Sequence, residues 1–255
     1  MPKILTGRLY VPPVLPTRGL LKSVLAPSLP PAAYDVDANL PRGNVPPMMM
    51  DGNSDVGDCV LAAQGKFLRR ALAAEYGTLI AVQEQEIVTA YFLETGGADT
   101  GLNIEDSLAN WMQAGWVGGG QLRKCAAYAR VDATNATEVK QAVSRLGGAI
   151  IGINLPQGWV DANDAGQVWD VPPADATIVG GHAMYVVAYD ADGVTVETWG
   201  QRQVLTWPAF AWCAADANQG ECVAVVRQDD AGVTPLDGDS LAVLQGELKE
   251  IQEAS

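Results

Sequence analysis

The sequence predicts an α+β fold: a helical half, then a twisted antiparallel β half, with an extended proline-rich arm before both. Three observations predict it. Prolines recur through the first 48 residues, which have no helical or strand periodicity. Apolar residues then recur at helical spacing from residue 58 onward. Apolar runs typical of strands follow residue 126.

The arm, residues 1–48, has too little apolar periodicity to form a core of its own. Because ordering each backbone residue costs about 1–2 kcal/mol, the arm must bury side chains on something larger. Either its own domain or a neighbouring chain would serve. We expect an extended arm that makes intersubunit contacts. Its anchors would be apolar residues, namely Leu9, Tyr10, Val14, Leu20 and Leu21.

Three helices are predicted in the first half of the domain. Residues 58–76 carry apolar side chains at helical spacing, with Gly77 as the stop signal and Asp55 or Asp58 as the cap. A second helix is expected over residues 83–93 and a third from about residue 103 to 115. Residues 118–120, all glycine, predict a loop.

The second half reads mainly as strands. A helix over residues 137–146 precedes the apolar run 149–153, which predicts a buried strand. Residues 183–189 and 194–198 are strands joined by an Asp-Ala-Asp-Gly turn, a hairpin signal. A short helix is expected at 207–214. Residues 49–228 then form the domain, and residues 229–255 form a tail with a short amphipathic helix.

Composition excludes several classes of function. The 255 residues carry a net charge of −14, so a nucleic-acid partner is not expected. The longest apolar runs are too short to span a bilayer, and prolines interrupt the N-terminus before a secretory signal forms. The four cysteines form no C-x-x-C pair and no zinc spacing, so we expect neither metal nor cofactor, and no disulfide framework.

Cys59 and His182 are the candidate reactive pair. Cys59 begins the first apolar helix, where a helix N-terminus and a nearby imidazolium would lower the pKa of its thiol. His182, the single histidine, follows two glycines at the mouth of a buried strand. Taken singly, a cysteine on an apolar helix is more often a core residue, and a histidine beside glycines is more often a turn or core residue. Their joint placement favours a nucleophile and its base.

Five segments in the same order resemble the papain-like cysteine peptidases. Residues 53–60 resemble Q-G-x-C-G-S-C-W, and residues 181–190 closely resemble D-H-A-V-L-V-V-G-Y-D. The other three segments are residues 85–88, residues 138–153 and residues 197–200, the last resembling N-S-W-G. The resemblance implies a papain-like fold and a thiol peptidase or amidase, with Cys59 as nucleophile and His182 as base.

The third and fourth catalytic positions depart from that family pattern. Glu197 aligns with the asparagine that orients the histidine, and Thr198 follows it. Because neighbouring strand residues point to opposite faces, only one of the two can face His182. Asn53 replaces the glutamine that holds the oxyanion, with the backbone N–H of Cys59 as second donor.

A closer resemblance, over nearly the whole chain, is to uncharacterised papain-like proteins of tailed phages and prophages. It rests on residues 48–59, 167–171, 180–190 and 198–200 and on the C-terminal helix. It implies a phage origin, and a location in the virion or host cytoplasm. Two functions stay open: a peptidase acting on a peptide substrate, or a capsid or tail decoration protein that contacts neighbouring virion subunits and has little or no activity.

Overall fold

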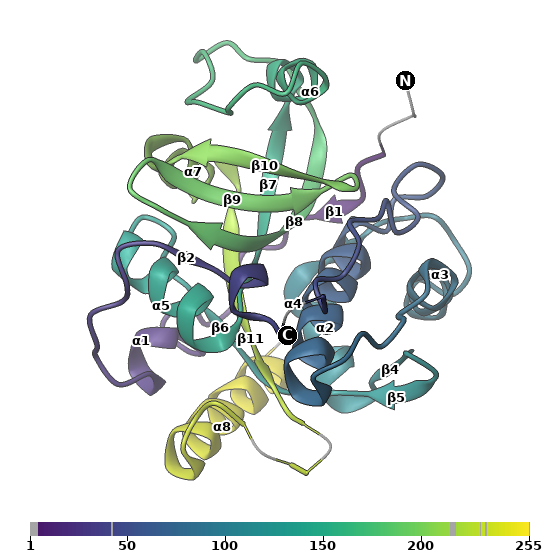
Figure 1. The fold of residues 1–255 in the computed structure, drawn as a ribbon, viewed down its shortest axis with the longest axis vertical. Helices are drawn as coiled ribbons and strands as arrows, with labels where there is room; N and C mark the ends of the chain where they lie inside the picture. The colour runs from purple at the N-terminus through teal and green to yellow at the C-terminus, as the bar shows by residue number, and fades with distance from the viewer. Residues whose placement is uncertain (1–4, 42, 215–217, 230, 233, 255) are drawn as a thin grey trace.

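The computed structural model describes residues 5–41, 43–214, 218–229, 231–232 and 234–254. Helices α2, α3 and α4 gather on one side of the molecule and a seven-stranded antiparallel sheet, with further helices around it, lies on the other, as Figure 1 shows. The predicted α+β class, papain-like with a helical half before a β half, is confirmed.

Three helices build the helical half, close to their predicted positions. They are α2 (Cys59–Tyr76), α3 (Glu84–Glu94) and α4 (Ile104–Gln113). Gly77 ends α2 with a left-handed φ of 62°, which a residue without Cβ adopts at little cost. The side chain of Asn103 accepts a hydrogen bond from the backbone N–H of Asp106 and so caps α4.

Two local expectations differ from the structure. Asp58 is the N-cap residue of α2, but its side chain makes no capping bond. The loop predicted at residues 118–120 is shorter: Gly118 belongs to β4 (Trp116–Gly118), and only residues 119 and 120 form the hairpin turn to β5 (Gln121–Arg123). Gly119 and Gly120 both have positive φ there, which two-residue hairpin turns require.

The sheet runs in the order β10-β9-β8-β7-β11-β6, and β2 (Tyr34–Asp35) also pairs with β8. Its central strands, β7 (Ala149–Pro156) and β8 (Ile178–Tyr189), pair over nearly their whole length. The predicted hairpin is β8 with β9 (Gly193–Thr198). The other strands are β6 (Cys125–Arg130), β10 (Gln201–Thr206) and β11 (Glu221–Arg227).

Helices α5 (Ala136–Leu146), α6 (Gln157–Asp164) and α7 (Trp207–Ala214) pack around this sheet. The predicted amphipathic tail is α8 (Gly238–Ala254), which buries Leu244, Leu248 and Ile251 and contacts β6. All four cysteines are buried free thiols. Among the described residues, no helix combines the length and apolarity needed to cross a membrane.

The described part of the arm lies on the arm's own domain. Its elements are β1 (Arg8–Leu9), α1 (Leu21–Val24), β2 and the 3₁₀ turn η1 (Asp37–Asn39). Leu21 is fully buried in the core that α2 and the sheet share, whereas Leu9 and Val14 are each 49% exposed. The arm thus completes a core on its own chain. Contacts with other subunits stay a prediction.

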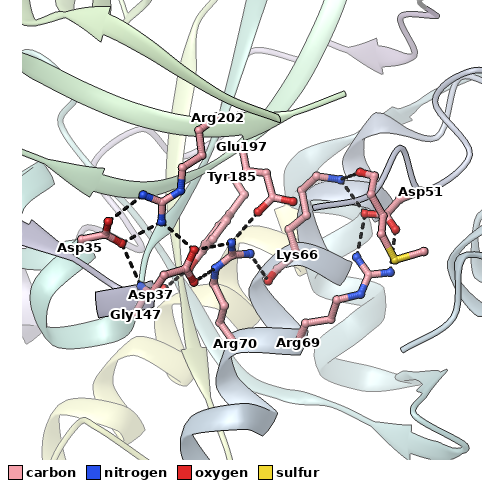
Figure 2. A network of polar contacts seen from close by, with 11 residues as sticks. Asp35, Asp37, Asp51, Lys66, Arg69, Arg70, Gly147, Tyr185, Glu197 and Arg202 are labelled. Atoms are coloured by element: carbon pink, nitrogen blue, oxygen red, sulfur yellow. Dashed lines mark hydrogen bonds and ion pairs between the residues drawn. The ribbon is translucent and has the colours of Figure 1, made fainter. Parts of the chain in front are cut away.

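Two groups of buried ion pairs fix α2 in place (Figure 2). In one, Asp51 bonds Lys66 Nζ at 2.6 Å and both terminal nitrogens of Arg69 at 2.6 and 2.8 Å. Burial would raise the pKa of Asp51, but Lys66 and Arg69 outweigh it and hold the pKa below its usual value. In the other, Arg70 reaches Asp37 of the arm, and Arg202 of β10 bonds both Asp35 and Asp37.

We therefore expect Asp51→Asn to destabilise the fold strongly. It leaves two buried cations without their shared carboxylate, a change that costs about 3–5 kcal/mol for a buried pair. Urea unfolding followed by circular dichroism measures it. Asp55→Asn is the matched control, because Asp55 is exposed, and it should stay within about 0.5 kcal/mol of the wild type. Equal stability of both variants would contradict the assigned role of Asp51.

Candidate active site

Cys59 opens α2 and lies against β8. Only 1% of the residue is exposed. The backbones of Ala183, on β8, and Gly7, in the arm, act on the thiol and lower its pKa. Burial raises the pKa of the thiol to about 11, although these two backbone groups oppose the shift. In this state Cys59 is a thiol at neutral pH, not the thiolate expected from its position at a helix N-terminus.

His182, on β8, immediately precedes Ala183, whose backbone acts on the Cys59 thiol. Its Nε2 lies 2.7 Å from Thr198 Oγ1. Its ring stacks on Trp199, with centroids 4.6 Å apart and planes 20° apart. Burial, and secondly the charge of Lys66, lower the pKa of His182 to about 3. The imidazole is therefore neutral at physiological pH.

The other ring nitrogen, Nδ1, is buried and has no hydrogen-bond partner among the described residues. When Nε2 carries the proton and donates it to Thr198, Nδ1 presents a lone pair. The two nitrogens therefore differ in role: Nε2 is held by Thr198, and Nδ1 is left to accept a proton from a neighbouring donor.

Thr198, not Glu197, contacts His182. The two residues alternate across β9, and the carboxylate of Glu197 points to the other face, where it lies 2.6 Å from Arg70 in a buried ion pair (Figure 2). Assigning Glu197 as the orienting residue is thus corrected by the geometry. The turn that follows puts Trp199 (φ 46°) and Gly200 (φ 72°) in left-handed conformations, which folds the indole back over the imidazole.

Asn53, expected to hold an oxyanion, lies beside this site with 3% of the residue exposed. Its Nδ2 donates to Asp58 Oδ1 at 2.7 Å, which occupies one of its two N–H donors. Burial raises the pKa of Asp58 to about 8, although Lys66 opposes the shift. Asp58, predicted only as a cap or surface residue, therefore orients Asn53. The void bounded by Asn53, Ala183, Thr198 and Trp199 has no room for a water molecule.

The arm crosses directly over Cys59. Gly7 accepts a hydrogen bond from Leu102 N at 2.7 Å, and β1 pairs in parallel with β3 (Leu102–Asn103). Leu5 N donates to Asn53 O at 3.2 Å. In Figure 1, β1 lies between the helical half and the sheet. Sequence reasoning gave no role to Thr6, Gly7 or Arg8, because nothing in their local pattern indicates which surface they cover.

Glycines make room for this crossing. A Cβ on Gly101 would overlap the Gly7 carbonyl, and one on Gly181 would overlap the Arg8 carbonyl. A Cβ on Gly180 would overlap the Thr6 hydroxyl, and one on Gly57 would lie 3.2 Å from Gly7 Cα. We call these four residues the glycine track. Without side chains at these four positions, the extended arm backbone can pass close to the segments that carry Cys59 and His182.

No protein-family model and no curated protein sequence matches the chain. Solved structures do. Xylellain, a cysteine protease from Xylella fastidiosa, is 16% identical, with a TM-score of 0.61 over 88% of this chain and 97% of that one. The Amb a 11 cysteine protease of ragweed pollen, in its proform, is 15% identical, with a TM-score of 0.60 over 85% and 71%.

A third match is the cysteine protease CMS1MS2 of Carica candamarcensis in complex with E-64. It is 14% identical, with a TM-score of 0.54 over 78% of this chain and all of that one. At these identities the likeness establishes the fold. It therefore supports the papain-like architecture predicted from the motifs, while the roles of single residues rest on the geometry above.

The protonation of His182 can be tested directly, because it is the only histidine in the chain. We expect its ¹⁵N resonances to show a neutral ring from pH 8 down to about pH 5, since burial lowers its pKa to about 3. Two-dimensional NMR of histidine-labelled protein measures this. A titration with a midpoint between pH 6 and 7 would contradict the dry, neutral site described here.

Proposed function

We propose that this chain is a papain-like cysteine peptidase, with Cys59 as nucleophile, His182 as base and Thr198 as the residue that orients His182. One observation carries the proposal. The start of α2 meets β8 beside His182, whose Nε2 is held by Thr198 while Nδ1 is unpartnered. A thiol and its base require a free ring nitrogen on the histidine, which Nδ1 supplies.

The reaction follows from these positions. Nδ1 of His182 takes the proton of the Cys59 thiol, and the sulfur attacks a peptide carbonyl. The Asn53 side chain and the Cys59 N–H donate to the oxyanion. His182 then gives its proton to the leaving amine, and water releases the acyl group from sulfur. Thr198 is a neutral hydroxyl, so it orients the ring without adding the charge that a carboxylate would supply.

The arm keeps this site inactive in the proposal. Gly7 lies over the sulfur where a substrate backbone would pass, and burial holds both Cys59 and His182 in their neutral forms. Removing the arm would admit water and favour the thiolate–imidazolium pair. The ragweed structure similar to this chain is itself a proform, which agrees with an N-terminal segment that must move before catalysis.

A structural role in a virion is less well supported. It required the arm to tie neighbouring subunits together, yet its described residues pack on their own domain and cover its cleft. A phage origin, and a location in the virion or host cytoplasm, remain hypotheses that rest on motif resemblance alone. They are compatible with a peptidase whose substrate is a phage or host protein.

Deleting residues 2–9 should release the site and leave the buried anchor Leu21 in place. We expect the Cys59 thiol to react with iodoacetamide about tenfold faster or more, because hydration lowers its pKa. Mass spectrometry of the digested protein measures the rate. Cys213, which is fully buried, is the internal control and should keep its rate.

The same deletion should produce cleavage of fluorescently quenched casein. Cys59→Ser in the deleted chain should abolish it. Thr198→Val should lower kcat by about tenfold or more, and Thr198→Ser, which keeps the hydroxyl, should restore most of it. A deleted chain with exposed Cys59 but no cleavage of casein or of a random peptide mixture would overturn the peptidase proposal.

A further inference from the structure

Arg8, the residue after Gly7, is buried in an acidic pocket beside the nucleophile. Its side chain is fully buried, and its Nε and Nη2 lie 2.9 and 2.8 Å from Glu221 Oε1. Nη2 also donates to the carbonyl of Gln219 at 2.6 Å. An arm residue that needed only to block the cleft would not require these contacts. A buried charge persists only where such partners compensate its lost hydration.

The pocket is shaped by the domain rather than by the arm. A Cβ on Gly152 of β7 would lie 2.6 Å from Arg8 Nε, so this glycine leaves the space that the guanidinium fills. Glu221 pairs with Gly152 across β7 and β11, which places the carboxylate beside that space. Gln219, whose carbonyl faces Arg8, is held in a left-handed conformation (φ 53°). Three parts of the β half therefore build the pocket: Glu221 supplies the charge, Gly152 the space and Gln219 the backbone acceptor.

We propose that Glu221 is the specificity-determining residue of this site, and that the pocket selects substrates with arginine next to the residue that lies over Cys59. The inference rests on the proposed peptidase function and names its substrate class: peptides or proteins with an arginine at the cleavage site. The arm is then a substrate-like sequence carried by the enzyme itself.

Position links the pocket to the chemistry. Gly7 packs against Gly57, two residues before Cys59, its backbone acts on the Cys59 thiol, and Arg8 is the next residue. The charge of Arg8 also acts on Cys59, lowering the pKa of its thiol. The glycine track lets the arm backbone lie close against the domain on either side of the Arg8 side chain. A substrate in the same track would place its own side chain against Glu221.

Arginine fits this pocket better than lysine. Its planar fork reaches the carboxylate through two nitrogens and the Gln219 carbonyl through one of them. A lysine ammonium is a single point donor that cannot span the same acceptors at once. Citrulline has nearly the shape of arginine but no charge. It therefore tests whether the pocket recognises the charge of arginine or only its shape.

The first experiment uses the full chain and the reactivity of Cys59. Arg8→Glu sets two carboxylates against each other and should expel the arm, raising the iodoacetamide rate of Cys59 about tenfold or more. Arg8→Glu with Glu221→Arg reverses both charges and should bring the rate back toward the wild type. The unchanged rate of Cys213 verifies folding. If Arg8→Glu is unstable, Arg8→Lys replaces it and should give a smaller increase.

The second experiment measures selection in trans on the Arg8→Glu chain, at pH 8. The probes are acetyl-Leu-Thr-Gly-X-Leu-amide peptides with X as arginine, lysine, citrulline or glutamate. We expect the arginine peptide to protect Cys59 from alkylation at a concentration about tenfold lower than the citrulline peptide needs. Adding Glu221→Gln should abolish that difference, whereas Glu253→Gln, on the exposed face of α8, should preserve it.

The outcomes separate the two proposals. Equal protection by arginine and citrulline overturns the Glu221 inference, as does an arginine preference that survives Glu221→Gln. A wild-type rate for Cys59 in both Arg8→Glu and Arg8→Lys overturns it too. Arginine-selective protection without cleavage of any peptide supports the pocket and overturns the peptidase proposal. Cleavage of peptides without a preference for arginine supports the peptidase proposal and overturns the Glu221 inference.

Discussion

The contact between the start of α2 and strand β8, kept dry by the arm, is the constraint on which the rest of the site depends. It brings Cys59 against the strand that carries His182, and the exclusion of water raises the pKa of the thiol to about 11 and lowers that of the imidazole to about 3. One packing contact therefore sets the burial of both groups and, through burial, their protonation. Both groups are held in their neutral forms, in which the thiol is a weak nucleophile.

Ion pairs hold the contact between α2 and β8 in place. Asp51 with Lys66 and Arg69, and Asp37 with Arg70 and Arg202, fasten α2 to the arm and to the sheet (Figure 2). Glu197 belongs to this framework because it pairs with Arg70. Its neighbour Thr198 then faces His182, so a single strand supplies both a structural residue and an orienting one. The alternation of side chains across β9 divides these roles.

Glycines, which have no side chain, shape the path of the arm as much as the side chains beside it do. The glycine track lets a backbone pass beside the sulfur, and Gly152 leaves room for a guanidinium. The arm uses both openings. In the proposed peptidase a substrate would use them too, so the arm would both close the site and indicate what the site binds.

The sequence alone determined the class of fold and the position of most helices and strands, and it singled out Cys59 and His182 as candidates, because periodicity and motif spacing are local properties of the chain. It left Glu197 and Thr198 undecided, since which of two adjacent strand residues faces inward depends on the sheet beneath them. It gave no sign that Asp58 orients Asn53, or that Arg8 meets Glu221, 213 residues away. Those pairings were decided only by the tertiary structure, because burial and charge at a site are set by segments that folding brings together from distant parts of the chain.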